Sequence, residues 1–125
     1  MTAVSTNETR RNYSALSGMV QLDTRAHLVV ITPPPMHQAM FDKFNPADAE
    51  IHWKEEELAG VAQLARECPA RVTIDLHRQF TGTVADSFWT DDGVHPSFEG
   101  HQIILRHIVQ ALAEATRPPA DRIPK

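Results

Sequence analysis

The pattern of apolar and polar positions predicts alternating helices and strands. From about Glu8 to Leu22, apolar side chains recur at the spacing of one helix face. Residues 27–32 and 71–76 are short, nearly unbroken apolar runs, which is typical of strands buried on both faces of a sheet. Residues 53–67 again have helical spacing, and a last helix is expected from about Ser97 to just before Pro118. Strand, helix and strand in this order predict a parallel, right-handed unit.

Each expected helix has an apolar stripe that could face the sheet. The segments between these elements, residues 36–51 and 77–94, lack such a period and are expected to be loops. The stripes consist of Tyr13, Leu16, Met19 and Val20 in the first helix, Leu58, Val61, Ala62 and Ala65 in the second, and Ile104, Ile108, Ala111, Leu112 and Ala115 in the last.

Two strands are too few to bury each other. Strands that are apolar on both faces belong inside a parallel sheet covered by helices, so at least one apolar edge would be unpaired. Either another chain supplies the missing strands, or this chain is the C-terminal part of a larger domain. We expect a loose tail over residues 1–7, a partial domain over 8–116 and a polar, proline-rich tail over 117–125. Self-association through the open sheet edge is a further expectation.

Composition limits the function without specifying it. A chain of 125 residues fits one domain, and 42% apolar with 22% charged residues is ordinary for a soluble globular protein. The net charge of -4 gives no electrostatic reason to expect nucleic acid as a partner. The longest apolar run, Leu28–Ile31, is far too short for a membrane span, and residues 1–11 do not resemble a signal peptide. A single cysteine, Cys68, excludes an internal disulfide and favours the cytoplasm.

The segment Asp91–Ser97 carries the most specific chemical signal. Asp92 precedes His95 by three residues, and Gly93 between them allows a tight turn. A carboxylate beside one ring nitrogen of a histidine fixes its tautomer and leaves the other nitrogen available as a general base. The sequence therefore predicts that Asp92 and His95 meet in one loop at the C-terminal ends of the strands, just before the last helix.

Residues 92–96, followed by Gly100, resemble the last conserved block of the SGNH hydrolase superfamily, the GDSL-type esterases and lipases. The branch near isoamyl acetate-hydrolysing esterases is the most similar, and residues 13–20, 28–35 and 72–76 match its helix and strand pattern. The resemblance covers roughly residues 10–113. It implies a three-layer, flavodoxin-like α/β fold with five parallel strands. This chain would be the C-terminal portion, with about two parallel strands and three helices.

The same resemblance implies ester hydrolysis by a serine, a histidine and an aspartate. Asp92 carries over as the orienting acid and His95 as the base, but the family's Gly-Asp-Ser and Gly-x-Asn-Asp blocks are absent. Asn7 is a faint echo of the oxyanion-binding asparagine. We therefore expect a carboxylic ester hydrolase whose nucleophile lies outside this chain. It would act on a small ester if an N-terminal half completes it.

The alternative is a catalytically inactive fragment, or a non-catalytic binding module of flavodoxin-like shape. A gene-model fragment, a split protein and a degenerate homologue all fit the sequence. No cofactor is expected in either case.

Other polar residues suggest less. Ser97 is expected to cap the last helix, and Ser87 lacks the strand-to-helix turn of a nucleophile. Asp75 ends a strand on the side where such sheets bind ligands, so it is either a ligand residue or a structural acid. No metal site is expected, because the six-residue spacing of His95, His101 and His107 does not align them on one helix face.

Overall fold

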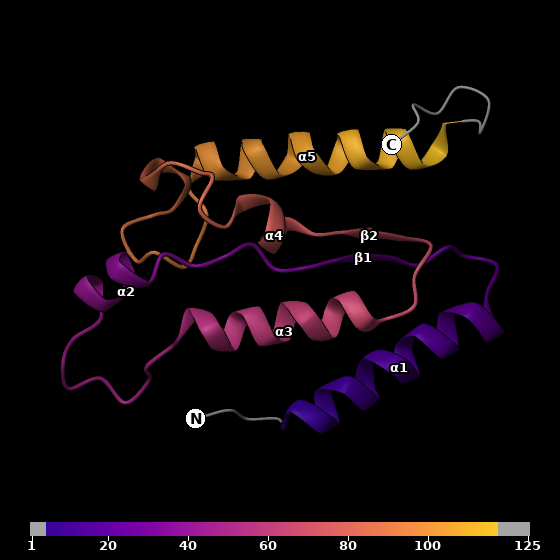
Figure 1. Ribbon diagram of the computed structural model, residues 1–125, viewed down its shortest axis with the longest axis horizontal. Helices are drawn as coiled ribbons and strands as arrows, with labels where there is room; N and C mark the ends of the chain where they lie inside the picture. Colours follow the sequence, from indigo (N-terminus) through magenta and orange to yellow (C-terminus); the bar gives the residue numbers. More distant parts are fainter. Residues whose placement is uncertain (1–4, 118–125) are drawn as a thin grey trace.

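The computed structural model describes residues 5–117, which form helices around a two-stranded parallel sheet (Figure 1). Val29 pairs with Val72 and Ile31 with Ile74, so the parallel unit predicted from the sequence is confirmed. The elements in chain order are α1 (Thr6–Asp23), β1 (Val29–Ile31), α2 (Gln38–Phe44), α3 (Glu55–Glu67), β2 (Val72–Ile74), α4 (Leu76–Phe80), the 3-10 helix η1 (Asp86–Phe88) and α5 (Phe98–Thr116).

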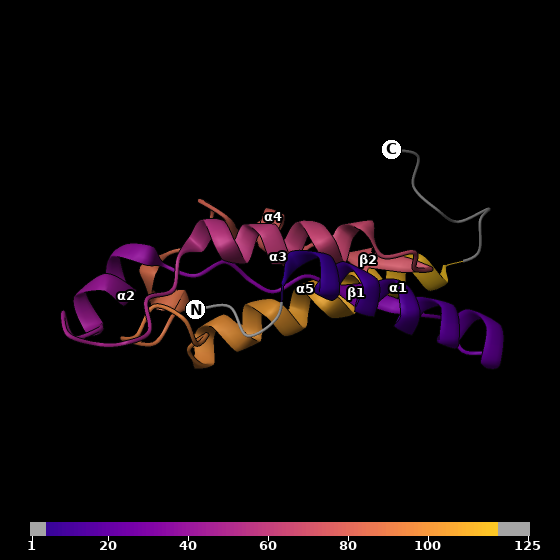
Figure 2. The ribbon, with the colours of Figure 1, turned by 90° about the horizontal axis from the view of Figure 1, so that it is seen from below.

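The sheet lies between two helices. In Figure 2, α3 and α5 are on opposite sides of the strands, and α3 contacts β1 while α5 contacts β2. The main core forms on the α5 side, around Ile74 and Phe88. Ile104, Ile108 and Ala111 of the predicted α5 stripe pack there, whereas Leu112 of that stripe is 37% exposed. The members of this cluster are Ile74, Leu76, Phe80 and Phe88, with Val29, Val72, Val84, Trp89, Ile103, Ile104, Ile108 and Ala111 packed against them. The α/β class predicted from the sequence is therefore confirmed.

Helix α1 lies outside these layers. It contacts α3, and both views place it on the side of β1 away from β2 (Figures 1 and 2). Its one buried residue is Ser17, whose hydroxyl donates to the Pro69 carbonyl over 2.7 Å. Leu16 and Met19, which belong to the predicted inner stripe, are each 58% exposed. Within residues 5–117 no strand lies under this stripe, so the sequence pattern is present but its packing is not.

The predicted loops contain short helices. Residues 36–51 include α2, and residues 77–94 include most of α4 and all of η1. Helix α2 has seven residues, α4 five and η1 three, which is too few for an apolar period to be visible. Side chains start two of them: the His37 ring accepts from Met40 N at 3.1 Å, and Asp75 accepts from Arg78 N at 3.0 Å.

The ends of the elements also differ from the predictions. Ser5 caps α1 by accepting from Glu8 N at 3.1 Å, so the helix starts before Glu8 and includes part of the expected N-terminal tail. Both strands have three residues and are shorter than predicted. Strand β2 is short because the chain turns into α4 directly after Asp75. The rest of both expected tails, residues 1–4 and 118–125, lies outside the described residues. No helix in residues 5–117 has the length and apolar character needed to cross a membrane.

Candidate functional site

Asp92 and His95 meet in the loop that precedes α5, as predicted. The His95 Nδ1 atom lies 2.5 Å from Asp92 Oδ2. An ionised carboxylate can only accept, so Nδ1 carries the proton and donates it to Asp92. In the neutral ring the Nε2 atom then has a free lone pair. The His95 side chain is 72% exposed, so this nitrogen is accessible from outside the chain.

The Asp92 carboxylate is held in place by the loop itself. Its Oδ1 atom accepts from Val94 N at 2.8 Å, from His95 N at 2.9 Å and from the Thr90 hydroxyl at 2.8 Å. Burial would raise the pKa of Asp92, but the amides of His95 and Val94, the His95 ring and the Thr90 hydroxyl together hold this pKa well below its usual range. The carboxylate therefore stays ionised near neutral pH and keeps the His95 ring oriented.

Gly93 makes the turn possible. Its φ of +71° lies in the left-handed region, and its N–H donates to the Thr90 carbonyl over 3.0 Å. Its carbonyl accepts from His37 N at 2.7 Å, which attaches the loop to the start of α2. A Cβ atom here would come within 2.6 Å of the His37 carbonyl oxygen and 2.8 Å of Phe41 N. The close approach and the backbone conformation both require glycine.

Trp89 attaches the same loop to the segment that follows β1. Its ring Nε1–H donates to the Pro35 carbonyl over 2.9 Å, and its backbone forms an antiparallel bridge with Pro96. The His37 and Trp89 rings meet edge to face with their centroids 5.1 Å apart. The loop thus lies at the C-terminal edge of the sheet, at the end of the molecule that also holds α2 (Figure 1).

Of the two candidate serines, Ser87 and Ser97, Ser97 has a structural role in this chain. Ser97 caps α5 by accepting from Gly100 N at 3.0 Å, as predicted, and its hydroxyl donates to the Ser87 carbonyl over 2.5 Å. Among residues 5–117, neither hydroxyl forms a hydrogen bond with the His95 ring. Asn7 lies in the first turn of α1, where its side-chain oxygen accepts from Arg10 at 3.3 Å.

Two further histidine–carboxylate pairs, which the sequence did not reveal, occur in the described residues. His37 Nε2 lies 3.0 Å from Asp86 Oδ1, and His77 Nε2 lies 2.5 Å from Glu55 Oε1. The partners are 49 and 22 residues apart, so no local spacing could have indicated them.

Neither additional pair has the arrangement of a general base. The His37 Nδ1 atom accepts from Met40 N, so the proton of the neutral ring is on Nε2, where it is donated to Asp86. Both His37 nitrogens are therefore occupied. His77 is only 7% exposed, and its partner Glu55 also accepts from Met36 N at 2.8 Å, which ties the start of α3 to the chain after β1. His95 differs because it is both oriented and exposed.

Asp75 is a structural acid, which decides between the two readings of the sequence. Its carboxylate accepts from Arg66 Nε at 2.5 Å and Nη2 at 3.1 Å, and from the Thr32 hydroxyl at 3.0 Å. Burial would raise the pKa of Asp75, but Arg66, the Arg78 amide and the Thr32 hydroxyl outweigh it and lower this pKa to about 2. Asp75, Arg66 and Thr32, the Asp75 cluster, join the C-terminal ends of both strands to α3.

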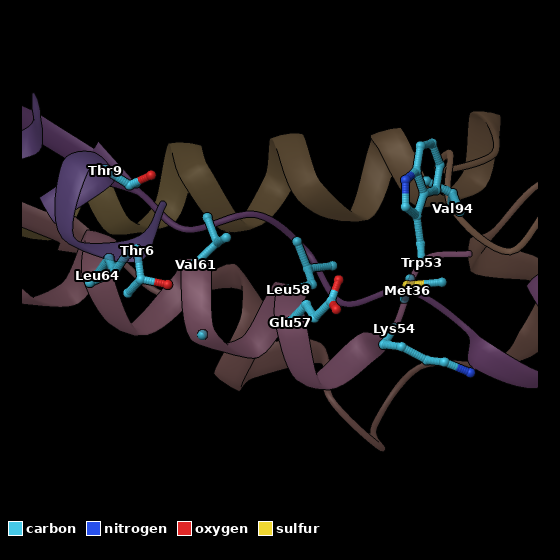
Figure 3. Close-up of a pocket in the computed structure, with 11 residues that line it drawn as sticks. Thr6, Thr9, Met36, Trp53, Lys54, Glu57, Leu58, Val61, Leu64 and Val94 are labelled. Carbon is cyan, nitrogen blue, oxygen red and sulfur yellow. The ribbon is translucent and has the colours of Figure 1, made fainter. Parts of the chain in front are cut away.

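A groove of about 590 Å³ begins beside the His95 loop and runs along α3 (Figure 3). Val94 and Trp53 lie at one end, and Thr6, Thr9 and Leu64 at the other. The lining is mostly apolar, as in many ligand sites. It consists of Thr6, Thr9, Met36, Trp53, Lys54, Glu57, Leu58, Gly60, Val61, Leu64 and Val94. In residues 5–117, no three histidine, cysteine or acidic side chains gather where they could hold a metal ion.

Comparisons with known proteins add no relative. No family model matches the chain, and no curated protein or solved structure matches it. Inference about its chemistry therefore starts from its own side chains.

Proposed function

We propose that this chain supplies the base and the orienting acid of a carboxylic ester hydrolase of the SGNH type, with the nucleophilic serine outside the chain. The observation that carries the proposal is the pairing of His95 Nδ1 with Asp92 over 2.5 Å in an otherwise exposed ring. The proposal implies a three-layer, flavodoxin-like domain in which β1 and β2 are two of five parallel strands.

The geometry suits one sequence of proton transfers. A serine hydroxyl within hydrogen-bond distance of His95 Nε2 gives its proton to that nitrogen while its oxygen attacks the ester carbonyl carbon. Asp92 stabilises the imidazolium that forms. The tetrahedral intermediate then releases the alcohol, which takes the proton back from Nε2. Water, activated by the same nitrogen, hydrolyses the acyl-serine and returns the site to its starting state.

The alternative, a non-catalytic binding module, has one observation in its favour. The groove of about 590 Å³ has the size and apolar lining of a ligand site, and it is present without the serine. In this case Asp92 would serve only to fold the loop, because three of its four hydrogen bonds go to groups other than the His95 ring.

A labelling experiment distinguishes the hydrolase from the binding module. It uses the protein as it occurs in its source cells, together with any segment or subunit that carries the serine. A fluorophosphonate probe reacts with serines that a base activates. We expect labelling of one serine outside residues 1–125 and hydrolysis of p-nitrophenyl acetate. His95→Ala should reduce both by at least about a hundredfold, the lower range for loss of a general base. Asp92→Asn should lower kcat and leave KM nearly unchanged.

His101→Ala is the matched control, since His101 is an exposed histidine in the first turns of α5. It should leave labelling and hydrolysis unchanged. Labelling that survives His95→Ala, or that maps to Ser87 or Ser97, would overturn the proposal and favour the binding module.

A further inference from the structure

His37 connects three segments that are distant in the sequence. Its backbone N–H donates to the Gly93 carbonyl over 2.7 Å, which attaches the start of α2 to the turn of the His95 loop. Its ring contacts η1 through Asp86 and meets the Trp89 ring edge to face. In residues 5–117 no hydrogen bond joins the His37 and His95 rings. A change in the His37 ring can therefore reach His95 only through the loop that carries it.

Only one form of the His37 ring satisfies both of its hydrogen bonds. Nδ1 accepts from Met40 N at 3.1 Å and so carries no proton, whereas Nε2 carries the proton that Asp86 accepts over 3.0 Å. As the N-cap of α2, the ring holds the His37 backbone at φ −98° and ψ 96°. The His37 carbonyl oxygen lies so near Gly93 that a Cβ atom there would be 2.6 Å from it. The capped residue thus packs directly against the turn.

Protonation of the His37 ring would break this arrangement. An imidazolium carries a proton on both nitrogens and has no acceptor. The Nδ1 proton would then face the Met40 N–H, so the cap of α2 would be lost. Asp86 could still accept from Nε2, but its side chain is 82% exposed, and ion pairs with exposed groups stabilise little. Attachment of the turn to α2 therefore needs a neutral His37.

Titratable groups reach the surroundings of His37 from three elements. Asp86 of η1 is the one titratable side chain that hydrogen-bonds to the His37 ring within the part of the chain that the structure describes. Asp92 and His95 lie in the loop that His37 N contacts, and Glu55 of α3 accepts from the amide of residue 36. Among these residue types, histidine is the one that ordinarily titrates between about pH 5 and 8.

We propose that His37 is a positioning residue for His95. In its neutral form, which caps α2 and donates to Asp86, the His37 ring keeps the His95 loop in the conformation that pairs the base with its carboxylate. The effect on hydrolysis rests on the proposed function, because it requires His95 to act as a base. The effect on the loop does not.

The proposal predicts an unusual pH profile for hydrolysis. Two histidines must be neutral for the reaction, His95 to take the proton from the serine and His37 to hold the loop. The logarithm of kcat/KM should therefore fall with acid more steeply than the slope of about one that a single base gives. At pH values below both titrations, the slope should approach about two.

Two substitutions distinguish the roles of the two ring nitrogens. In His37→Asn the side-chain oxygen can accept from Met40 N, as asparagine does at many N-caps, and it does not titrate. In His37→Gln the amide nitrogen can still donate to Asp86, but glutamine is not among the residues that favour an N-cap. We expect kcat to be at least about tenfold higher in His37→Asn than in His37→Gln, because a misplaced base costs rate.

His37→Asn should also return the acid slope to about one, since only His95 then has to lose its proton. The matched control is His101→Asn, the same substitution at an exposed histidine of α5. It should change neither kcat nor the steep acid slope.

Amide hydrogen exchange in the full chain of 125 residues reports on the loop without any substrate. NMR locates the pH at which the His37 ring takes up its proton. Exchange of the hydrogen-bonded Gly93 and Val94 amides is then compared between wild type and His37→Asn on both sides of that pH. The ratio of the two rates cancels the intrinsic pH dependence of exchange. It should be about one above the His37 titration, and wild type should exchange at least about tenfold faster below it.

Three results would overturn the inference: an exchange ratio that stays near one across the His37 titration, equal kcat in His37→Asn and His37→Gln, and the same acid slope in wild type and His37→Asn. The exchange measurement needs no serine. If it gives the expected ratio while fluorophosphonate labelling fails, the hydrolase is refuted and the positioning of the loop stands. The opposite combination refutes the positioning alone.

Discussion

The loop around His95 and the open edge of β1 differ in how much of their structure this chain provides. In the loop, Asp92 accepts four hydrogen bonds, all from Thr90, Val94 and His95. At the edge, β1 pairs with β2 alone among residues 5–117, and no strand in that range lies beneath the apolar stripe of α1. The groups for acid–base chemistry are thus set by local contacts, whereas the sheet described in residues 5–117 consists of two strands with apolar surface exposed beside them.

Among the variants described here, Gly93→Ala should have the largest effect, since a Cβ atom at this position of the His95 loop would overlap the backbones of His37 and Phe41. The left-handed φ costs about 1–2 kcal/mol for a residue with a Cβ, and overlap with the His37 and Phe41 backbones adds a similar amount. We expect a loss of about 3 kcal/mol in the free energy of unfolding, measured by urea denaturation. The Asp92–His95 contact should also be lost, which the ring nitrogen signals of His95 would report.

Gly82→Ala is the matched control. Gly82 has a φ of +72°, but a Cβ atom there meets nothing within 4 Å. It should cost only about 1 kcal/mol and leave the His95 ring signals unchanged. Equal losses for the two variants would mean that the loop is not anchored on α2 as described.

Asp75→Asn tests the cluster that ties the strand ends to α3. The folded-state pKa of about 2 lies below the usual 3.8, so ionised Asp75 stabilises the fold by about 2 kcal/mol above about pH 4. This contribution is lost as the pH falls through about 2. Urea denaturation should therefore show a loss of about 2 kcal/mol at pH 7 and a much smaller one near pH 2.

Glu67→Gln serves as the control for this prediction. It removes the exposed ion pair with Arg10, in which the side chains are 50% and 43% exposed. Such pairs contribute at most about 1 kcal/mol. If Asp75→Asn changed stability no more than Glu67→Gln at pH 7, the Asp75 cluster would not stabilise the fold as proposed.

The isolated chain should self-associate weakly through its exposed apolar side chains, which lie on α5 as well as near the open edge of β1. Large apolar side chains are exposed on α5 as well as α1, including Leu105 at 62% and Val109 at 55%. Light scattering should give an apparent mass that rises with concentration in the high micromolar range, and Leu105→Lys should reduce this rise. Lys43→Glu, an exposed change on α2, should not. A constant monomer mass throughout the range would contradict the prediction.

The smallest expected effect is on ester hydrolysis by the chain alone. A base without a positioned nucleophile and oxyanion donors contributes little, because the members of a catalytic triad act as a unit. The isolated chain should hydrolyse p-nitrophenyl acetate no faster than an equal concentration of free histidine. A faster rate that is lost in Ser87→Ala or Ser97→Ala would show that the nucleophile is in this chain after all.

The sequence predicts local features well and distant contacts poorly. The pairing of Asp92 with His95 could be predicted because only two residues, Gly93 and Val94, separate them. Helix α5 could be predicted because its apolar period is long. The pairs His37–Asp86 and His77–Glu55 depend on how distant segments pack, which no spacing encodes. The apolar period of α1 shows which side of that helix is suited to packing against another element. It does not show whether this chain contains that element.

The two tryptophans lie in different surroundings, which gives the protein two optical probes. Trp53 lines the groove and is exposed, whereas Trp89 is half-buried and hydrogen-bonded to Pro35 beside the His95 loop. A ligand that enters the groove should shift the emission of Trp53 to shorter wavelength and shield it from acrylamide. Emission from Trp89 should respond instead to disturbance of the loop. With Trp53→Phe and Trp89→Phe, each event can be followed by fluorescence on its own.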